Sequence, residues 1–235
     1  MKKIAMLLAV VLILGMTLAS CTGQSAHMAY VGEGFTMENA EGKTLTCENG
    51  QLTGDMRTGS SSQIDISEDA KERSAAFSTP PSDTYHVQFQ GLSNEMAIQF
   101  GKGKVPPYLV QGKGVQEMTL ERNTSLSATG EEMVLSIAMP APENLGSGVM
   151  LCQGFANGQA TMTLTETGFR MEGMNVLQIM VELVGQGVLT YPMGSWGEQP
   201  VTFELDLTNF AEGKATLTIG YLEKEITFDP VFAGS

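Results

Sequence analysis

Histidine is scarce in this sequence, and its scarcity argues against one large class of enzymes. The 235 residues contain two histidines, His27 and His86. A Ser-His-Asp hydrolase needs a base beside its nucleophile, usually a histidine held by a third group. His27 falls in an irregular polar stretch, and His86 alternates with glutamines on the predicted wet face of a strand. We therefore expect no catalytic triad, and the sequence predicts no catalytic residue and no cofactor.

Basic residues are also few. The chain has 13 Lys and Arg against 26 Asp and Glu, a formal charge of −13. A surface this acidic repels phosphate backbones and anionic lipid headgroups. The charge excludes a nucleic-acid partner, and it means that electrostatic attraction would not hold the protein to a membrane.

Apolar runs long enough to span a bilayer are absent. The longest run, Ile4 to Ala19, has 16 residues, and a spanning helix needs roughly 20. It follows the cationic start Met1-Lys2-Lys3 and precedes small residues, which is the order of an export signal. The alternative, an uncleaved membrane helix, is disfavoured by this length.

The end of this signal carries a specific motif. Leu18-Ala19-Ser20-Cys21 resembles the lipobox of bacterial lipoproteins. The resemblance implies cleavage before Cys21, a diacylglyceryl group on its thiol, and a location on the cell membrane facing outside the cytoplasm. Two or more acyl chains anchor a protein stably, whereas one chain binds reversibly. Cleavage would remove Lys2 and Lys3, leaving 13 − 2 = 11 basic groups and a charge of 11 − 26 = −15.

The mature chain has 235 − 20 = 215 residues, enough for one large β domain or two small ones. We interpret residues 1–20 as the signal, 21–28 as a flexible tether and 29–235 as a β-rich extracytoplasmic domain. The breaker Thr79-Pro80-Pro81-Ser82 marks a candidate sub-boundary near 79–83.

Alternation of apolar and polar residues predicts the fold class. A period of two marks strands with one buried and one wet face, which build antiparallel sheets. The residues expected to face the core include Tyr85, Val87, Phe89, Met133, Leu135, Ile137, Met139, Met162, Leu164, Val201, Phe203, Leu205, Leu207, Ala215, Leu217 and Ile219. With 27 Gly and 9 Pro supplying turns, we expect an all-β antiparallel sandwich.

An internal repeat refines this expectation. Residues 155–164 and 210–219 match at six of ten positions, and 40–46 repeats most of the theme. Asn157-Gly158 is a strong hairpin signal and Glu212-Gly213 a weaker one, because glycine adopts positive φ easily. The repeat therefore predicts recurring hairpins whose second strand carries Thr-x-Thr on its wet face.

Two segments depart from this pattern. Residues 68–77 read as a short helix, with a plausible N-cap at Ser67 and acidic residues in the first turn. Residues 175–184 fit strand and helix about equally, and their Val and Ile content favours a strand.

Three cysteines give few options. With Cys21 assigned to lipid, Cys47 and Cys152 remain as candidates for a disulfide outside the cytoplasm. The alternative is two separately buried small apolar side chains.

Acidic and methionine side chains give weak candidate sites. Glu204 and Asp206 lie two apart on one strand face and could act as a glycosidase-type pair, although such charges are ordinary on a solvated face. Asp65, Glu68 and Asp69 could bind calcium, but an acidic helix start explains them with fewer assumptions. Met118, Met133, Met139 and Met162 fall at expected core positions, which argues against copper(I). Zinc spacings are absent, so no metal is expected.

One loop could contact a ligand. A Gly- and Pro-rich segment at residues 191–200 contains Tyr191, Glu198 and the only Trp of the chain, Trp196. The ring could stack on a sugar or anchor a protein, or it could fold back onto the core. From these features we expect a membrane-anchored lipoprotein with a non-enzymatic binding or structural role, whose partner is an envelope protein or glycan. A carbohydrate-recognition module using the Trp196 loop is the alternative, and a glycosidase-type enzyme ranks third.

Overall fold

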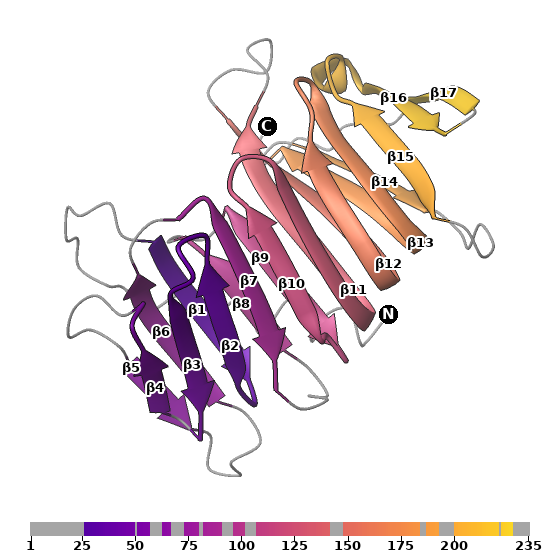
Figure 1. The fold of residues 1–235 in the computed structure, drawn as a ribbon. Coiled ribbons are helices and arrows are strands. Elements are labelled where there is room, and N and C mark those ends of the chain that lie inside the picture. Colours follow the sequence, from indigo (N-terminus) through magenta and orange to yellow (C-terminus); the bar gives the residue numbers. More distant parts are fainter. Residues whose placement is uncertain are drawn as a thin grey trace.

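The described part of the chain is almost entirely β-strand (Figure 1). The computed structural model describes residues 26–49, 51–56, 63–66, 73–79, 82–90, 96–101, 107–141, 148–183, 187–192, 200–220 and 222–227. The strands belong to one sheet of 17 strands, and every pairing in it is antiparallel. The prediction of an all-β antiparallel fold is confirmed.

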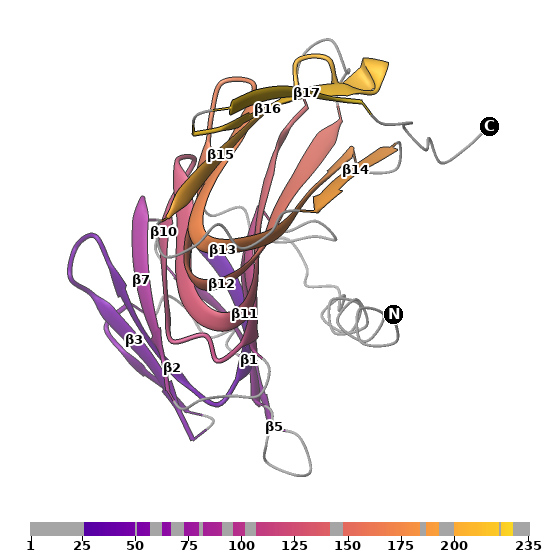
Figure 2. The ribbon, with the colours of Figure 1, turned by 90° about the vertical axis from the view of Figure 1, so that its right-hand side faces the viewer.

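The sheet folds over into two layers, as Figure 2 shows. The front layer contains, in order of pairing, β4 (Gln51–Gly54), β3 (Thr44–Glu48), β2 (Phe35–Asn39), β7 (Thr84–Phe89) and β10 (Glu117–Glu121). It continues, beyond the long strands, with β15 (Val201–Asp206), β16 (Lys214–Ile219) and β17 (Leu222–Thr227). The back layer contains β5 (Gln63–Ile66), β6 (Arg73–Thr79), β1 (Ala26–Gly32), β8 (Met96–Phe100) and β9 (Tyr108–Lys113), with β14 (Gly187–Pro192) at its far edge.

Three long strands join the layers. β11 (Ser125–Pro140), β12 (Val149–Leu164) and β13 (Gly168–Leu183) have 16 residues each. The first half of β11 pairs with β10 in the front layer and its second half pairs with β9 in the back layer. β13 likewise pairs with β15 through one half and β14 through the other. The single sheet therefore encloses its own core, whereas a sandwich of two separate sheets would have no shared strands.

Irregularities in the strands produce the fold-over. The register shifts between Gly130 and Met133 of β11, and between Asn157 and Ala160 of β12. Such bulges bend a strand and increase its twist. Gly158 has φ +79°, so its positive φ serves the bend of β12. The prediction of a hairpin at Asn157-Gly158 is therefore wrong.

The other copies of the repeat do connect paired strands. Residues 40–43 form the turn between β2 and β3. β15 and β16 are joined through the short 3-10 turn η2 (Phe210–Glu212), which ends at Gly213 with φ +73°. Hairpins thus recur at two of the three repeats, and the third copy lies within a continuous strand.

The predicted helix at 68–77 is also wrong in its described residues, 73–77, while residues 68–72 lie outside the described ranges. Its second half lies in β6, which pairs with β1 on one side and with β5 on the other. In the described residues of this segment, strand pairing on both sides satisfies the backbone and outweighs helix propensity. The described residues of the segment 175–184 belong to β13, which confirms the strand prediction there.

The boundary of the tether also moves. β1 begins at Ala26, so residues 26–28 belong to the sheet and the predicted tether 21–28 extends too far. Met28 and Tyr30 are buried, which explains why this segment is held. Pro80 and Pro81 lie outside the described residues, while the buried side chains on both sides of residues 79–83 belong to one core cluster.

That core fills the space between the layers. It contains the inward residues predicted from alternation, among them Tyr85, Leu135, Met162, Phe203 and Leu217, each at most 1% exposed. Phe89, Met139, Leu164 and Val201 are partly buried and pack against it. The assignment of strand faces is confirmed.

Candidate functional site

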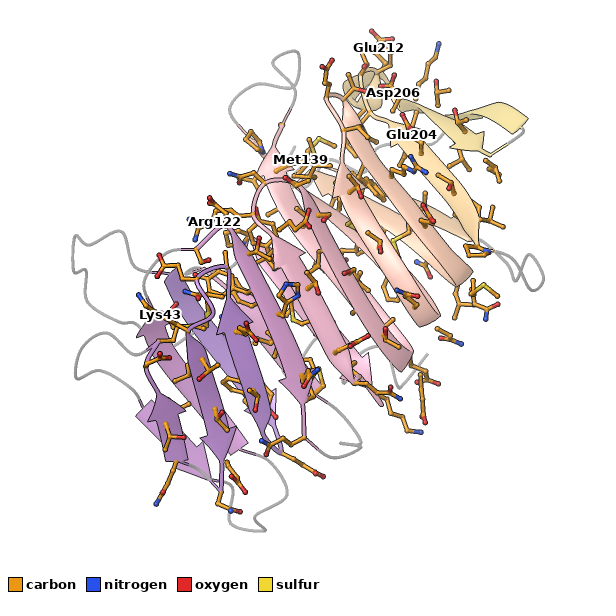
Figure 3. All side chains as sticks on the ribbon, viewed as in Figure 1. Lys43, Arg122, Met139, Glu204, Asp206 and Glu212 are labelled. Carbon is orange, nitrogen blue, oxygen red and sulfur yellow. The ribbon has the colours of Figure 1, made fainter. Side chains whose placement is uncertain are left out.

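The outer surface of the front layer is a broad polar face. Strand alternation points every second residue away from the core. We call the described outward residues of this layer the front face: Thr36, Glu38, Thr44, Thr46, Glu48, Gln51, Thr53, Thr84, His86, Gln88, Glu117, Thr119, Glu121, Ser125, Ser127, Thr129, Gln159, Thr161, Thr163, Arg170, Glu172, Thr202, Glu204, Asp206, Lys214, Thr216 and Thr218. Figure 3 shows side chains covering it. None of these residues is aliphatic, Phe, Tyr or Trp.

Strand pairing arranges these side chains in rows. One row crosses seven strands through Glu38, His86, Thr119, Ser127, Thr161, Glu172 and Thr202. The next row crosses through Thr84, Glu121, Ser125, Thr163, Arg170, Glu204 and Thr218. Neighbours are spaced about 4.8 Å across the strands and about 7 Å along them. The Thr-x-Thr pattern of the sequence thus becomes a regular two-dimensional array of hydroxyl and carboxylate groups.

Hydrogen bonds connect neighbours within this array. His86 Nδ1 lies 3.0 Å from Thr119 Oγ1, and Thr129 Oγ1 donates to Glu117 Oε1 over 3.3 Å. Arg170 Nη2 lies within 3.3 Å of both Glu172 Oε2 and Thr202 Oγ1. His86 is exposed on β7, as its alternation with glutamines predicts. These contacts hold the side chains in defined positions without burying them.

The two acidic residues considered for catalysis are both exposed on β15, where Figure 3 labels them. For Asp206, partial burial acts to raise the pKa, and hydrogen bonds from Thr208 and Thr167 outweigh it, so the pKa of this carboxyl is lowered. The Thr208 amide and hydroxyl donate to Asp206 Oδ1 over 2.8 and 2.6 Å. A carboxylate held ionised is suited to accepting hydrogen bonds. A glycosidase acid needs the opposite shift.

The outer surface of the back layer differs in chemistry. Five apolar side chains of β12 and β13 point outward there: Val149, Leu151, Phe155, Leu177 and Met180. We call this group the apolar patch. Val149 and Leu177 are each 42% exposed, and the other three are half-buried. Leu177 is the extra residue at the bulge opposite Phe155 and Ala156. Sequence reasoning missed the patch because β12 is apolar on both faces here, so alternation gives no signal.

The predicted disulfide between Cys47 and Cys152 is absent. Cys152 carries a free thiol, buried on β12, with its Sγ 3.8 Å from Met139 Sδ. Cys47 is buried on β3, five strand positions from β12 in the sheet, which corresponds to on the order of 20 Å. Burial raises the pKa of the Cys152 thiol to about 12. The alternative interpretation, two separately buried small side chains, describes both residues.

The methionines of the core also follow the sequence interpretation. Met118, Met133 and Met162 are buried, and Met139 packs against the core. Within the described ranges, no three His, Cys, Asp or Glu side chains come together as metal ligands.

Several predicted site residues fall outside the part of the chain that the structure describes. They are Cys21, Trp196, Glu198, Glu68 and Asp69. Tyr191 belongs to β14 and Asp65 to β5. No helix in the described ranges is long and apolar enough to cross a membrane.

Comparison with known proteins adds no relative. No family model matches the chain, and no curated protein or solved structure is significantly similar to it. Its function therefore has to be inferred from the chemistry of its own surfaces. The front face, as a large ordered array of polar groups, is the strongest candidate site.

Proposed function

We infer that this chain is a lipid-anchored protein of the cell envelope that acts by binding, with the front face as its recognition surface. The observation that carries this proposal is the front face itself, which places rows of hydroxyls and carboxylates across the sheet. A regular surface of this kind suits an extended partner that makes many similar contacts. A catalytic site would instead concentrate a few groups in a cavity.

The anchor rests on the N-terminal motif. The signal order and Leu18-Ala19-Ser20-Cys21 resemble those of bacterial lipoproteins. Diacylglyceryl modification of Cys21 would hold the protein at the outer face of the membrane despite its charge, because acyl chains insert independently of headgroup electrostatics. The partner would then be another component of the envelope.

The composition of the front face indicates the chemistry of that partner. Hydroxyls donate and accept hydrogen bonds, whereas carboxylates only accept them. The face holds Arg170 and Lys214 against seven carboxylates. It therefore suits a repeating polar polymer that is rich in hydroxyl, amide or amine donors, and a glycan of the cell wall has these groups.

Co-sedimentation with purified peptidoglycan tests this recognition. The acylated mature protein, solubilised in detergent, is expected to sediment with the polymer. Replacing Thr119, Ser127 and Thr161 together by Ala removes three adjacent hydroxyls from one row. At about 0.5–1.5 kcal/mol per hydrogen bond, binding should weaken roughly 10-fold to 1,000-fold.

The matched control places three changes on the other layer. Gln99, Gln111 and Gln178 are half-buried on outward positions of the back layer. Their combined replacement by Ala should leave sedimentation unchanged. Equal loss in both variants, or no sedimentation of the wild-type protein, would refute the front face as a glycan-binding surface.

A further inference from the structure

The apolar patch has no counterpart on the front face. Its five side chains lie on the outward faces of β12 and β13, interspersed with the polar outward residues Gln153, Gln178 and Glu182. The exposed charges Lys113, at the end of β9, and Glu132, in the middle of β11, pair beside the bend, close to the Phe155 and Leu177 end of the patch. A group of partly exposed apolar side chains of this kind is typical of a surface that contacts lipid or another protein.

The N-terminal connection limits where the molecule can lie. β1 begins at Ala26 in the back layer, five residues after Cys21. Five residues of extended chain reach at most about 18 Å. An acylated Cys21 would therefore hold the domain against the bilayer surface, and one of its surfaces must face the lipid.

Register relates this attachment point to the patch. Met28 of β1 pairs with Phe100, which pairs with Tyr108, which pairs with Ile137, which pairs with Cys152. Residues N-terminal to Met28 therefore lie level with the segment that precedes Cys152, where Leu151 and Val149 project outward. Four strand positions separate β1 from β12, so the attachment point and the Val149 and Leu151 end of the patch share one end of the back layer, while Phe155 lies level with Val31 at the other end of β1.

We propose that the apolar patch is the membrane-contacting surface of the lipid-anchored protein. This proposal rests on the proposed anchoring through Cys21. The chemistry of the two surfaces determines which of them faces the lipid. Bringing the front face to the lipid would desolvate its carboxylates and place them against anionic headgroups, which is unfavourable. The back layer instead offers Leu, Val, Phe and Met side chains, which gain free energy by leaving water at the interface. This orientation leaves the front face open to the envelope.

Depth-dependent fluorescence quenching tests this orientation. Single cysteines replace Val149 or Leu177 in the patch, or Thr161 on the front-layer half of β12, and each is labelled with an environment-sensitive fluorophore. Thr161 is the matched control because it shares β12 with Val149. Protein without an added cysteine corrects for labelling of Cys47 and Cys152, which are buried. The acylated proteins are reconstituted in phosphatidylcholine vesicles that contain lipid with a nitroxide near the headgroup.

Fluorophores at positions 149 and 177 should be quenched several-fold more strongly than one at position 161, because an interfacial apolar face lies within about 10 Å of the headgroups. Three results would overturn the proposal while leaving the anchor intact. They are stronger quenching at position 161, no quenching in vesicle-bound protein, or concentration-dependent crosslinking of the Val149→Cys variant that shows a second copy on the patch. If the wild-type protein does not sediment with vesicles, the anchoring itself fails and the membrane contact fails with it.

Discussion

Asp206 ends β15 by accepting two hydrogen bonds from Thr208, and its lowered pKa makes this local interaction measurable. A carboxyl with a lowered folded-state pKa stabilises the fold at pH values above its unfolded pKa of about 3.9, and the stabilisation is lost as the pH falls through the folded value. Asp206→Asn should therefore reduce the free energy of unfolding near neutral pH, by less than about 1 kcal/mol because the side chain is exposed. The difference should shrink as the pH falls below the unfolded pKa of about 3.9.

Urea unfolding of both proteins at pH 7 and pH 3 measures this effect. Glu204→Gln removes a carboxylate from the same strand and face, so it reports the effect of one negative charge without the Thr208 contacts. A difference between wild type and Asp206→Asn that grows at low pH would contradict the assignment.

The cysteines show that the number of cysteines and the expected compartment do not predict a disulfide. Cys47 and Cys152 satisfied the compartment argument for pairing, but pairing depends on distance, and distance follows from strand order. The buried thiol of Cys152 contacts Met139 within a strand-filled core. No local signal distinguishes a buried thiol from half of a disulfide.

At the scale of the element, the bend of β12 depends on one backbone conformation. Gly158 has φ +79°, and a Cβ at this position would meet no atom within 4 Å. The cost of Gly158→Ala is therefore backbone strain alone, about 1–2 kcal/mol for a left-handed conformation. Gly158→Asn should cost less, because Asn tolerates this region better than Ala.

Denaturant unfolding of these two variants, beside the exposed neighbour Gln159→Ala, measures this strain. The Gln159 variant should stay within about 0.5 kcal/mol of wild type, as surface changes usually do. If Gly158→Ala is as stable as wild type, the bend does not require a positive φ at this position.

The sequence could predict which face of a strand is buried, but it could not predict where a strand continues or which segments pair as strands. Alternation in 201–207 and 133–139 identified the core side of β15 and β11 because one face is wet and the other dry. Asn157-Gly158 has the same local chemistry in a tight turn and in a bulge, so the sequence could not show that β12 continues through it. The helix prediction failed at residues 73–77 because β1 and β5 supply pairing partners from outside the segment.

For the whole molecule, the division into two chemically distinct surfaces follows from the folded sheet. Thr-x-Thr repeats predicted wet positions, but only the register of successive strands, from β2 to β15, aligns them in rows. The apolar patch depends likewise on which half of β12 belongs to the back layer. An anchored domain with its apolar patch against the lipid and its front face towards the envelope accounts for both surfaces.

The central claim is that this domain is held at the membrane through acylated Cys21. Mass spectrometry of the N-terminal peptide of the protein purified from bacterial membranes tests it most directly. The peptide should begin at Cys21 and carry the mass of a diacylglyceryl group, and Cys21→Ser should abolish both the cleavage and the added mass. A peptide that begins at Met1, or an unmodified Cys21 in membrane-bound protein, would contradict the account.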